Sequence, residues 1–284
     1  MAGDMELTQI DVDEVLRKRI PHRYRYIPRF LISWLARAIH QDELNAILRH
    51  MAAQPGGIEA ADVAMSDLQV TATLVGIDNV PAGGRYIFAS NHPLGGLDGL
   101  SLISALGHKY DGKIRFLVND LLMAVQPLQP VFLPVNKYGR QSRGNAAEIE
   151  RQYRSDNQMV TFPAGLCSRM DAHGVVRDLP WHKMVVTHAV SSRRDVVPVY
   201  FEGENSRHFY RMARLRKRLG IKFNYEMVYL PGEMFKCRGA NFKVHVGKPV
   251  PWQSLDAAHP AQEALRLQQL AYSLNPAGKT MQSN

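Results

Sequence analysis

The sequence contains little cysteine and no long hydrophobic run. Its two cysteines, Cys167 and Cys237, lie far apart, and neither belongs to a CxxC pair. The sequence therefore argues against a disulfide framework and a thiolate metal site, and it favours a reducing compartment. No apolar stretch reaches the roughly 18 residues that a membrane-spanning helix needs, and the N-terminus lacks the basic and then apolar pattern of a secretory signal. We expect a protein that is soluble or that lies on a membrane surface.

Several catalytic signatures are also missing. No GxSxG occurs, which excludes the strand-to-helix elbow of a serine hydrolase. The segment GHKYDGKI matches a phosphate-binding P-loop as far as its second lysine, but Ile114 stands where that loop needs a hydroxyl for magnesium. His173, His182 and His188 are spaced too irregularly for a helical metal pair, so no metal site is predicted.

Acidic residues are fewer than basic ones. The chain has 26 Asp and Glu against 35 Lys and Arg, a formal net charge of +9. Such a surface attracts anions: nucleic acid, phosphorylated ligands or anionic lipid. The aromatic residues do not interleave with the basic ones as in an RNA-binding motif, and no zinc finger or helix-turn-helix pattern is present. We expect no nucleic-acid partner, and a basic nucleic-acid- or membrane-binding protein without catalysis is the alternative to an enzyme.

What the sequence does contain is a regular alternation of strand and helix patterns. Of its 284 residues 45% are hydrophobic, enough for a large core. From Gly84 onward, short apolar runs alternate with helical patterns, which predicts an α/β fold with a mixed, largely parallel sheet flanked by helices. We divide the chain into a basic N-terminal helical region (residues 1–75), an α/β domain (76–255), and a C-terminal helix with a polar tail (256–284). Within the first region, a connection is expected at about residues 54–64.

Two helical segments combine basic and apolar residues. In the N-terminal region Leu31, Trp34, Leu35 and Ile39 recur at helical spacing after a run of arginines. The segment RHFYRMARLRKRLGIK has a basic face formed by Arg207, Arg211, Arg214, Arg218 and Lys222. Either segment suits contact with an anionic membrane or packing on the protein itself, and the residues alone leave both open.

The stretch SNHPLGGLDG joins a histidine to an aspartate directly after the apolar run YIFA. His92 falls just beyond the carboxyl end of a strand, where ligands of such sheets bind, and Pro93 keeps it out of a helix. Gly95 and Gly96 permit a tight turn before Asp98, where a helix begins. A carboxylate there can cap the helix and also hold the Nδ1–H of the imidazole, so that Nε2 becomes a general base. The alternative is a surface histidine beside an ordinary capping aspartate.

Two later loops supply candidate anion contacts. The loop PAGLCSRM contains Gly165, whose small size lets backbone N–H groups approach a ligand, together with Ser168 and the guanidinium of Arg169. The loop NKYGRQSR brings Lys137 and Arg140 to the same edge if the strands are neighbours. A turn with a solvated arginine is the alternative for each loop.

Cys167, in the first of these loops, is a second candidate for the chemistry. A thiolate there with His92 as its base would act by covalent catalysis. Buried structural cysteine is the commoner fate of such a residue, and we rank this mechanism below general base catalysis.

Four segments, in this order, resemble the motifs of the glycerolipid acyltransferase superfamily, which includes bacterial lysophosphatidic acid acyltransferases. They are SNHPLGGLD, VFLPVNKYGR, FPAGLCSR and VVPVYFEG. The resemblance covers about residues 76–250, and four ordered motifs are far more specific than any one of them.

Two departures from the family pattern affect its interpretation. Five residues rather than the usual four separate His92 from Asp98. On a regular helix the extra residue turns the carboxylate by about 100°, so the pair can meet only if His92 lies outside the helix. Ala164 stands where the third motif usually has a glutamate associated with the acceptor. This pattern resembles a bacterial branch whose acceptors include acylated amino acids such as ornithine or glycine lipids.

The resemblance implies an O-acyltransferase that acts on lysophosphatidic acid or on a lyso-ornithine or lyso-glycine type of lipid. His92 would be the general base and Asp98 its partner, with acyl-CoA or acyl carrier protein as donor and no metal or organic cofactor. A lipid acceptor further implies a peripheral protein on the cytoplasmic face of an anionic membrane. The candidate substrate-binding residues are Asn91, Gly95, Gly96, Lys137, Arg140, Gly165, Ser168 and Arg169.

Overall fold

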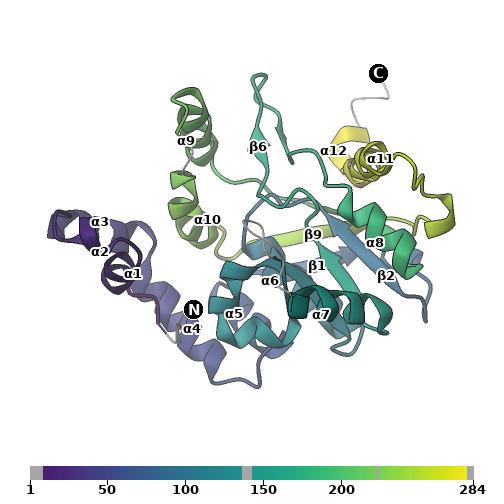
Figure 1. Ribbon diagram of the computed structural model, residues 1–284, viewed down its shortest axis with the longest axis horizontal. Helices are drawn as coiled ribbons and strands as arrows, with labels where there is room; N and C mark the ends of the chain where they lie inside the picture. The colour runs from purple at the N-terminus through teal and green to yellow at the C-terminus, as the bar shows by residue number, and fades with distance from the viewer. Residues whose placement is uncertain (1–8, 136–142, 222–223, 280–284) are drawn as a thin grey trace.

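The centre of the fold is a seven-stranded β-sheet, seen in the computed structural model of Figure 1, which describes residues 9–135, 143–221 and 224–279. The strand order is β1-β9-β8-β2-β5-β3-β4, and all neighbouring pairs are parallel except β8 and β9. This confirms the predicted mixed, largely parallel sheet. The strands are β1 (Thr71–Val75), β2 (Tyr86–Ser90), β3 (Ile114–Asn119), β4 (Phe132–Val135), β5 (Gln158–Thr161), β8 (Asp195–Phe201) and β9 (Asn241–Val246), and β6 (Arg169–Met170) and β7 (Val176–Arg177) form a separate antiparallel hairpin.

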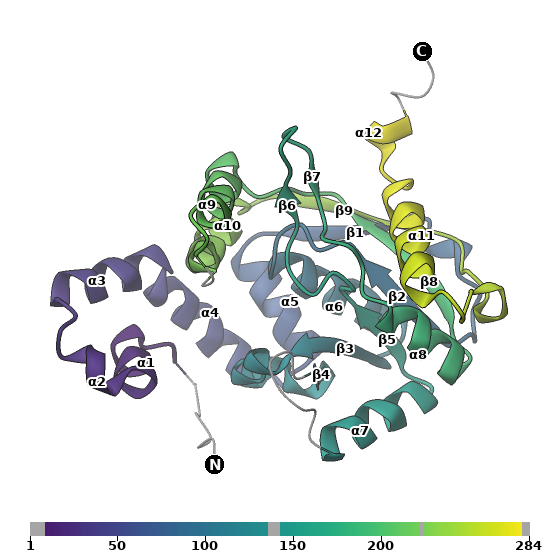
Figure 2. The ribbon, with the colours of Figure 1, turned by 45° about the horizontal axis from the view of Figure 1, so that its top comes forward.

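Helices flank the sheet and extend beyond it, as predicted (Figures 1 and 2). The α-helices are α1 (Val12–Arg19), α2 (Pro21–Tyr24), α3 (Arg29–Ala38), α4 (Gln41–Ala52), α5 (Ile58–Asp67), α6 (Leu97–Lys109), α7 (Arg143–Arg154), α8 (Met184–Ser192), α9 (Arg207–Arg218), α10 (Leu230–Lys236), α11 (Pro260–Tyr272) and α12 (Pro276–Lys279). Short 3-10 turns include η2 (Asp120–Ala124), η3 (Gln126–Val131) and η4 (Tyr225–Tyr229).

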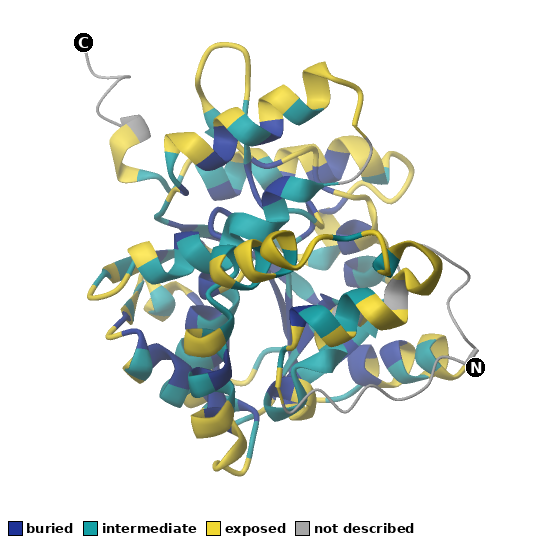
Figure 3. Ribbon diagram, turned by 90° about the vertical axis from the view of Figure 1, so that its left-hand side faces the viewer, coloured by how far each residue is buried: buried dark blue, intermediate teal, exposed yellow. Residues whose placement is uncertain are grey.

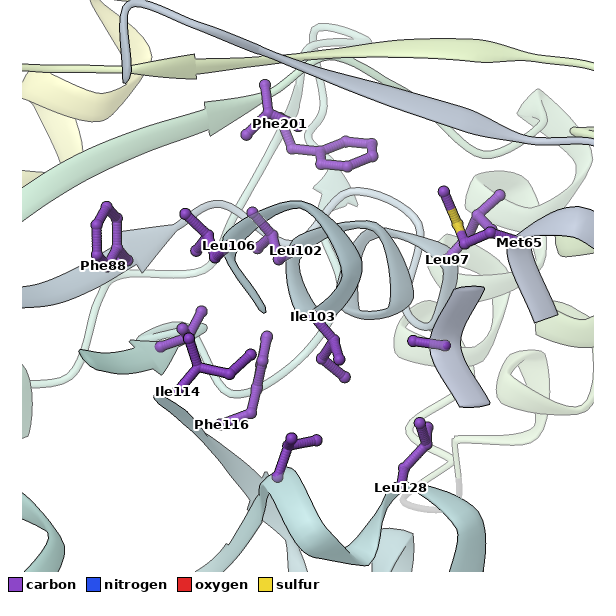
Figure 4. Close-up of a cluster of buried hydrophobic side chains, with 14 of the residues drawn as sticks. Met65, Phe88, Leu97, Leu102, Ile103, Leu106, Ile114, Phe116, Leu128 and Phe201 are labelled. Atoms are coloured by element: carbon purple, nitrogen blue, oxygen red, sulfur yellow. The ribbon is translucent and has the colours of Figure 1, made fainter. Parts of the chain in front are cut away.

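The central strand β2 lies between β5 and β8, and all five of its residues are buried. Phe88 packs in the cluster shared with α5 and α6, where Leu102 and Leu106 lie beside it (Figure 4). Ile87 and Ala89 belong to the cluster on the opposite face, with α8 and α11. A strand covered on both faces must be apolar on both sides, which explains the continuous run YIFA. The loop that follows β2 therefore starts from a rigid position in the middle of the sheet.

Two parts of the N-terminal region differ from the prediction. Where a connection was expected at residues 54–64, the chain turns at Gly56 and Gly57, both with positive φ, and then forms α5. Buried alanines on α5 allow this helix to pack on α6. Within the region predicted as helical, Thr71–Val75 is strand β1, which pairs in parallel with β9. The sequence signal of β1 is weak, because an edge strand with alternating exposure needs few apolar residues.

The first three helices lie apart from the sheet and are joined to it through α4 (Figures 1 and 2). No residue of α3 is buried, and Figure 3, which views the molecule from this end, shows mostly exposed and intermediate residues on the nearest helices. Across the described ranges, no helix has both the length and the hydrophobicity needed to cross a bilayer.

Candidate active site

Asn91 anchors the loop that carries His92. Its side-chain Oδ1 accepts the N–H of Phe201 at 2.6 Å, and its Nδ2 donates to the Phe201 carbonyl at 3.0 Å. Phe201 ends β8, the neighbour of β2, so Asn91 ties the ends of two adjacent strands together. The side chain is buried in this role, and its predicted contact with substrate stays a prediction.

His92 and Asp98 lie side by side, with His92 Nδ1 2.9 Å from Asp98 Oδ2. His92 remains outside the helix, which begins at Leu97, and Gly95 takes the left-handed conformation at φ 82° that the extra residue requires. The Asp98 side chain is fully buried, and that of His92 is 15% exposed. This geometry rules out the surface histidine that we considered as an alternative, and Asp98 lies inside the first turn of α6 rather than at its N-cap.

The hydrogen bonds to Asp98 determine which nitrogen of His92 carries a proton. Besides the imidazole, the carboxylate accepts the backbone N–H groups of Leu94 at 2.9 Å, Gly95 at 3.4 Å and Gly99 at 2.9 Å. A buried carboxylate with these donors is an acceptor toward all its partners, so we infer that Nδ1 is the protonated nitrogen of the neutral imidazole. The lone pair then belongs to Nε2, on the opposite side of the ring.

Phe162 orients the imidazole from one side. The two rings are stacked, with 3.9 Å between their centroids and 18° between their planes. Phe162 follows β5, the strand next to β2, so the sheet order brings it to His92 across 70 positions of sequence. Sequence reasoning missed this residue, and only the neighbouring position of the strand ends could have indicated it.

An apolar cavity of about 510 Å³ opens beside His92. Helices α4, α5 and α6, the strand β3 and the segment η2–η3 surround it. Its walls include Gly99 and Ile103 on α6, Phe116 on β3 and Leu128 on η3. Gly95, Gly96 and Gly165 also line the cavity, which places three of the predicted substrate-binding residues at the imidazole.

The other residues predicted in the third motif are engaged with protein groups. Ser168 is buried, with its N–H on the His92 carbonyl at 2.7 Å. Arg169 donates to the carbonyl of Cys167 at 2.8 Å and forms an ion pair at 3.3 Å with the fully buried Glu226. A role of Arg169 as an anion contact stays a prediction, as does that of Lys137 and Arg140, which lie outside the described residues.

Cys167 is 1% exposed, and burial raises the pKa of its thiol while the neighbouring Arg169 opposes that rise. A buried thiol with a raised pKa is a poor source of thiolate. The structure therefore favours the mechanism in which His92, and not Cys167, acts on substrate.

Comparison with known proteins identifies the family. The model of an acyltransferase family matches residues 14–275 of this chain. The chain belongs to this acyltransferase family. The match confirms the resemblance that the four motifs indicated, and it makes the protein an enzyme of acyl transfer rather than a binding protein without catalysis.

Two curated relatives of this acyltransferase are similar over nearly their full lengths. The lyso-glycine lipid O-acyltransferase of Bacteroides thetaiotaomicron is 46% identical over 272 residues, which cover 95% of this chain and 99% of the relative. The protein of the same name from Phocaeicola vulgatus is 43% identical, with coverage of 95% and 97%. Among solved structures, the 1-acyl-sn-glycerophosphate acyltransferase of Thermotoga maritima aligns with a TM-score of 0.45 and 14% identity, over 88% of this chain and 96% of that one.

Proposed function

We propose that this acyltransferase moves a fatty acyl group from a thioester donor to the hydroxyl of a lyso-glycine lipid, with His92 as general base. The observation that carries this proposal is an imidazole, held by the buried carboxylate of Asp98, at the wall of an apolar cavity. The names of the two relatives support the acceptor. The absence of a glutamate at Ala164 is in keeping with an acceptor other than a glycerol phosphate.

The reaction requires one proton to move in two steps. Nε2 of His92 removes the proton of the acceptor hydroxyl as the oxygen attacks the thioester carbonyl carbon. The new C–O bond forms, the C–S bond breaks, and the imidazolium returns the proton to the departing sulfur, which leaves as a thiol. Asp98 stabilises the imidazolium in between. The thioester is already activated, so we propose that no metal or organic cofactor takes part, with acyl-CoA or acyl carrier protein as donor.

The negative charge that develops on the carbonyl oxygen also needs a hydrogen-bond donor to stabilise it. Three glycine N–H groups are candidates. That of Gly165 donates to the Phe162 carbonyl at 2.9 Å, and that of Gly95 faces Asp98 Oδ2 at 3.4 Å. The N–H of Gly96 has no acceptor among the described residues, and Gly96 lines the cavity at the N-terminal end of α6. The positive end of the helix dipole also favours an anion there. We therefore assign the Gly96 N–H as the oxyanion donor.

The experiment that tests the function compares acceptors and donors directly. The purified chain is incubated with lyso-glycine lipid, lyso-ornithine lipid or lysophosphatidic acid, each with acyl-CoA and with acyl carrier protein, and products are identified by mass. Acylation of the lyso-glycine lipid above the other acceptors is the expected result. Acylation of lysophosphatidic acid alone would contradict the proposed acceptor, and no acylation with salt-sensitive binding to nucleic acid would favour the non-catalytic alternative.

The cavity is expected to hold the acyl chain of the donor. Ile103 lies one helical turn beyond Gly99, so its side chain is about 6 Å further along α6 from His92. In Ile103→Trp, the larger side chain should exclude the end of a long chain. Each lost methylene costs about 0.8 kcal/mol, so four of them lower kcat/KM for long donors on the order of 10²-fold. Donors four carbons shorter should retain near-normal kcat/KM, and Ile103→Leu is the control. An equal loss for all chain lengths would show that the chain binds elsewhere.

We further propose that the enzyme rests on the cytoplasmic face of an anionic membrane through α3 and the basic helix α9. Tyr26, Phe30, Leu31 and Trp34 are exposed apolar side chains on and beside α3, and α9 exposes arginines together with Leu215. Aromatic and basic residues in this combination are typical of helices that lie in a membrane interface.

A matched pair of leucines tests this membrane contact. Leu31 is 43% exposed on α3, and Leu265 is 41% exposed on α11, which lies on the far side of the sheet (Figure 2). Leu31→Ser should weaken binding to vesicles with anionic lipid by about tenfold, and Leu265→Ser should leave it unchanged. Cosedimentation measures the binding of both variants. Equal binding by the two would contradict the proposal that α3 contacts the membrane.

A further inference from the structure

Asp178 is a second carboxyl group beside His92, 86 positions away in the sequence. Its Oδ1 accepts the backbone N–H of His92 at 3.2 Å and the hydroxyl of Ser168 at 2.6 Å. Its Oδ2 accepts the indole Nε1–H of Trp181 at 3.0 Å. Asp178 is buried, and each of these three bonds is donated to it, so both of its oxygens are used inside the protein.

His92, Ser168 and Asp178 form a closed ring of hydrogen bonds. The ring is completed by the backbone N–H of Ser168, which donates to the His92 carbonyl at 2.7 Å. As a result, Asp178 holds the N–H of His92 and Ser168 holds its carbonyl. Restraint of the backbone on both sides of a Cα fixes the direction of the Cα–Cβ bond, and the position of Nε2 depends on this direction together with the contacts that hold the ring. Within His92, Asp98 contacts the imidazole and so holds the ring, while its other bonds hold the N–H groups of Leu94, Gly95 and Gly99.

The C-terminal helix α11 supports this ring. The backbone N–H of Asp178 donates to the Tyr272 hydroxyl at 2.7 Å, and the Gln268 side chain donates to the Leu179 carbonyl at 3.1 Å. Both Gln268 and Tyr272 belong to α11, which packs on α8 and β8 (Figure 2). This helix lies outside the segment with the four motifs, yet it fixes the carboxyl group that holds the His92 backbone.

We propose that Asp178 is a positioning residue for acyl transfer, which holds the His92 backbone so that Nε2 is aimed at the acceptor hydroxyl. The inference rests on the proposed role of His92. Among the described residues, Asp178 and Ser168 do not belong to the walls of the cavity. They therefore act through His92 without contact with the acyl chain, and they affect the reaction step more than binding. A displacement of about 1 Å at a reacting group can cost on the order of 10²-fold in rate.

Asp178→Asn tests this role with little change in shape. The NH₂ group of the new amide must replace one of the two carboxylate oxygens. It then faces either the indole N–H of Trp181 or the His92 N–H and the Ser168 hydroxyl, and the bonds at that position are lost. We expect kcat to fall about 10- to 100-fold, with KM for donor and acceptor within about twofold of the wild type. Asp171→Asn is the matched control, because Asp171 lies in the β6–β7 hairpin and its side chain accepts the local backbone N–H groups of His173 and Val175. It should retain wild-type kcat.

The same substitution in a His92→Ala background separates positioning from a general loss of structure. Without the imidazole there is nothing to aim, so Asp178→Asn should change the slow residual rate by less than about twofold. Ser168→Ala, which removes only one bond of the ring, provides a milder variant in both backgrounds in case Asp178→Asn does not fold. Wild-type kcat in both single variants, or an equal fall in both backgrounds, would overturn the inference. Full activity of His92→Ala would instead overturn the proposed function.

Discussion

His92→Ala is expected to lower kcat by about 10²- to 10⁴-fold, the usual contribution of general base catalysis. The acyl chain should still bind, because the cavity walls on α6, β3 and η3 are unchanged. The fold should also persist, since His92 is held by its backbone N–H and carbonyl as well as by its ring. Steady-state acyl transfer measures the effect, with KM for the donor expected within a few fold of the wild type.

His173→Ala serves as the control for this substitution. His173 lies in the turn of the β6–β7 hairpin and is exposed, so its loss should leave kcat unchanged. A His92→Ala enzyme with more than a tenth of the wild-type kcat would contradict the role of the imidazole as a base. A loss that is due to unfolding would appear as a change in the far-ultraviolet circular dichroism of the variant.

Asp98→Asn should lower kcat on the order of 10³- to 10⁴-fold, by analogy with the carboxylate that orients the histidine in serine hydrolases. The carboxylate accepts from three backbone N–H groups and from the imidazole. An asparagine has only one acceptor oxygen. Its NH₂ group would therefore occupy the place of the other carboxylate oxygen and face an N–H group that needs an acceptor. If the amide oxygen takes the Oδ1 position and accepts the Gly99 N–H, the NH₂ group faces His92 Nδ1, and the imidazole is left in the wrong tautomer with Nε2 protonated.

Asp62→Asn provides a matched control for this effect. Asp62 also contacts a histidine, His108 Nε2 at 2.8 Å, but it does so on the outer side of α5 and α6 with both side chains partly exposed. Its replacement should change kcat by less than about twofold. Steady-state kinetics of both variants, together with thermal unfolding, distinguishes the loss of orientation from a loss of stability. Equal kcat values for the two variants would contradict the role of Asp98.

Much of the fold and the centre of the site could be predicted because their signals are local. Five residues separate His92 from Asp98, and a proline and two glycines among them, together with the strand that ends just before His92, leave few paths for the chain. The strands of the sheet were visible as apolar runs because β2, β5 and β8 are covered on both faces. By contrast, β1 is an edge strand, and its alternating exposure carried no clear pattern.

Contacts between distant residues could not be predicted in the same way. Arg169 was predicted to face an anionic ligand, yet its guanidinium contacts Glu226, 57 positions away. Phe162 and Asp178 were not singled out at all, because a phenylalanine after a strand and an aspartate after a hairpin are common in any sequence. Their contacts with His92 exist only because β5 lies next to β2 and because the hairpin returns to the same edge.

The sequence by itself determined the α/β class and the order of the four motifs, and it indicated the pairing of His92 with Asp98, since these signals lie in short local stretches of the chain. The tertiary structure decided the order of the strands, the cavity beside the imidazole, and the way Phe162, Ser168 and Asp178 surround His92. The physical reason is that contacts across a sheet depend on which strands become neighbours, and one pattern of apolar runs is compatible with several strand orders.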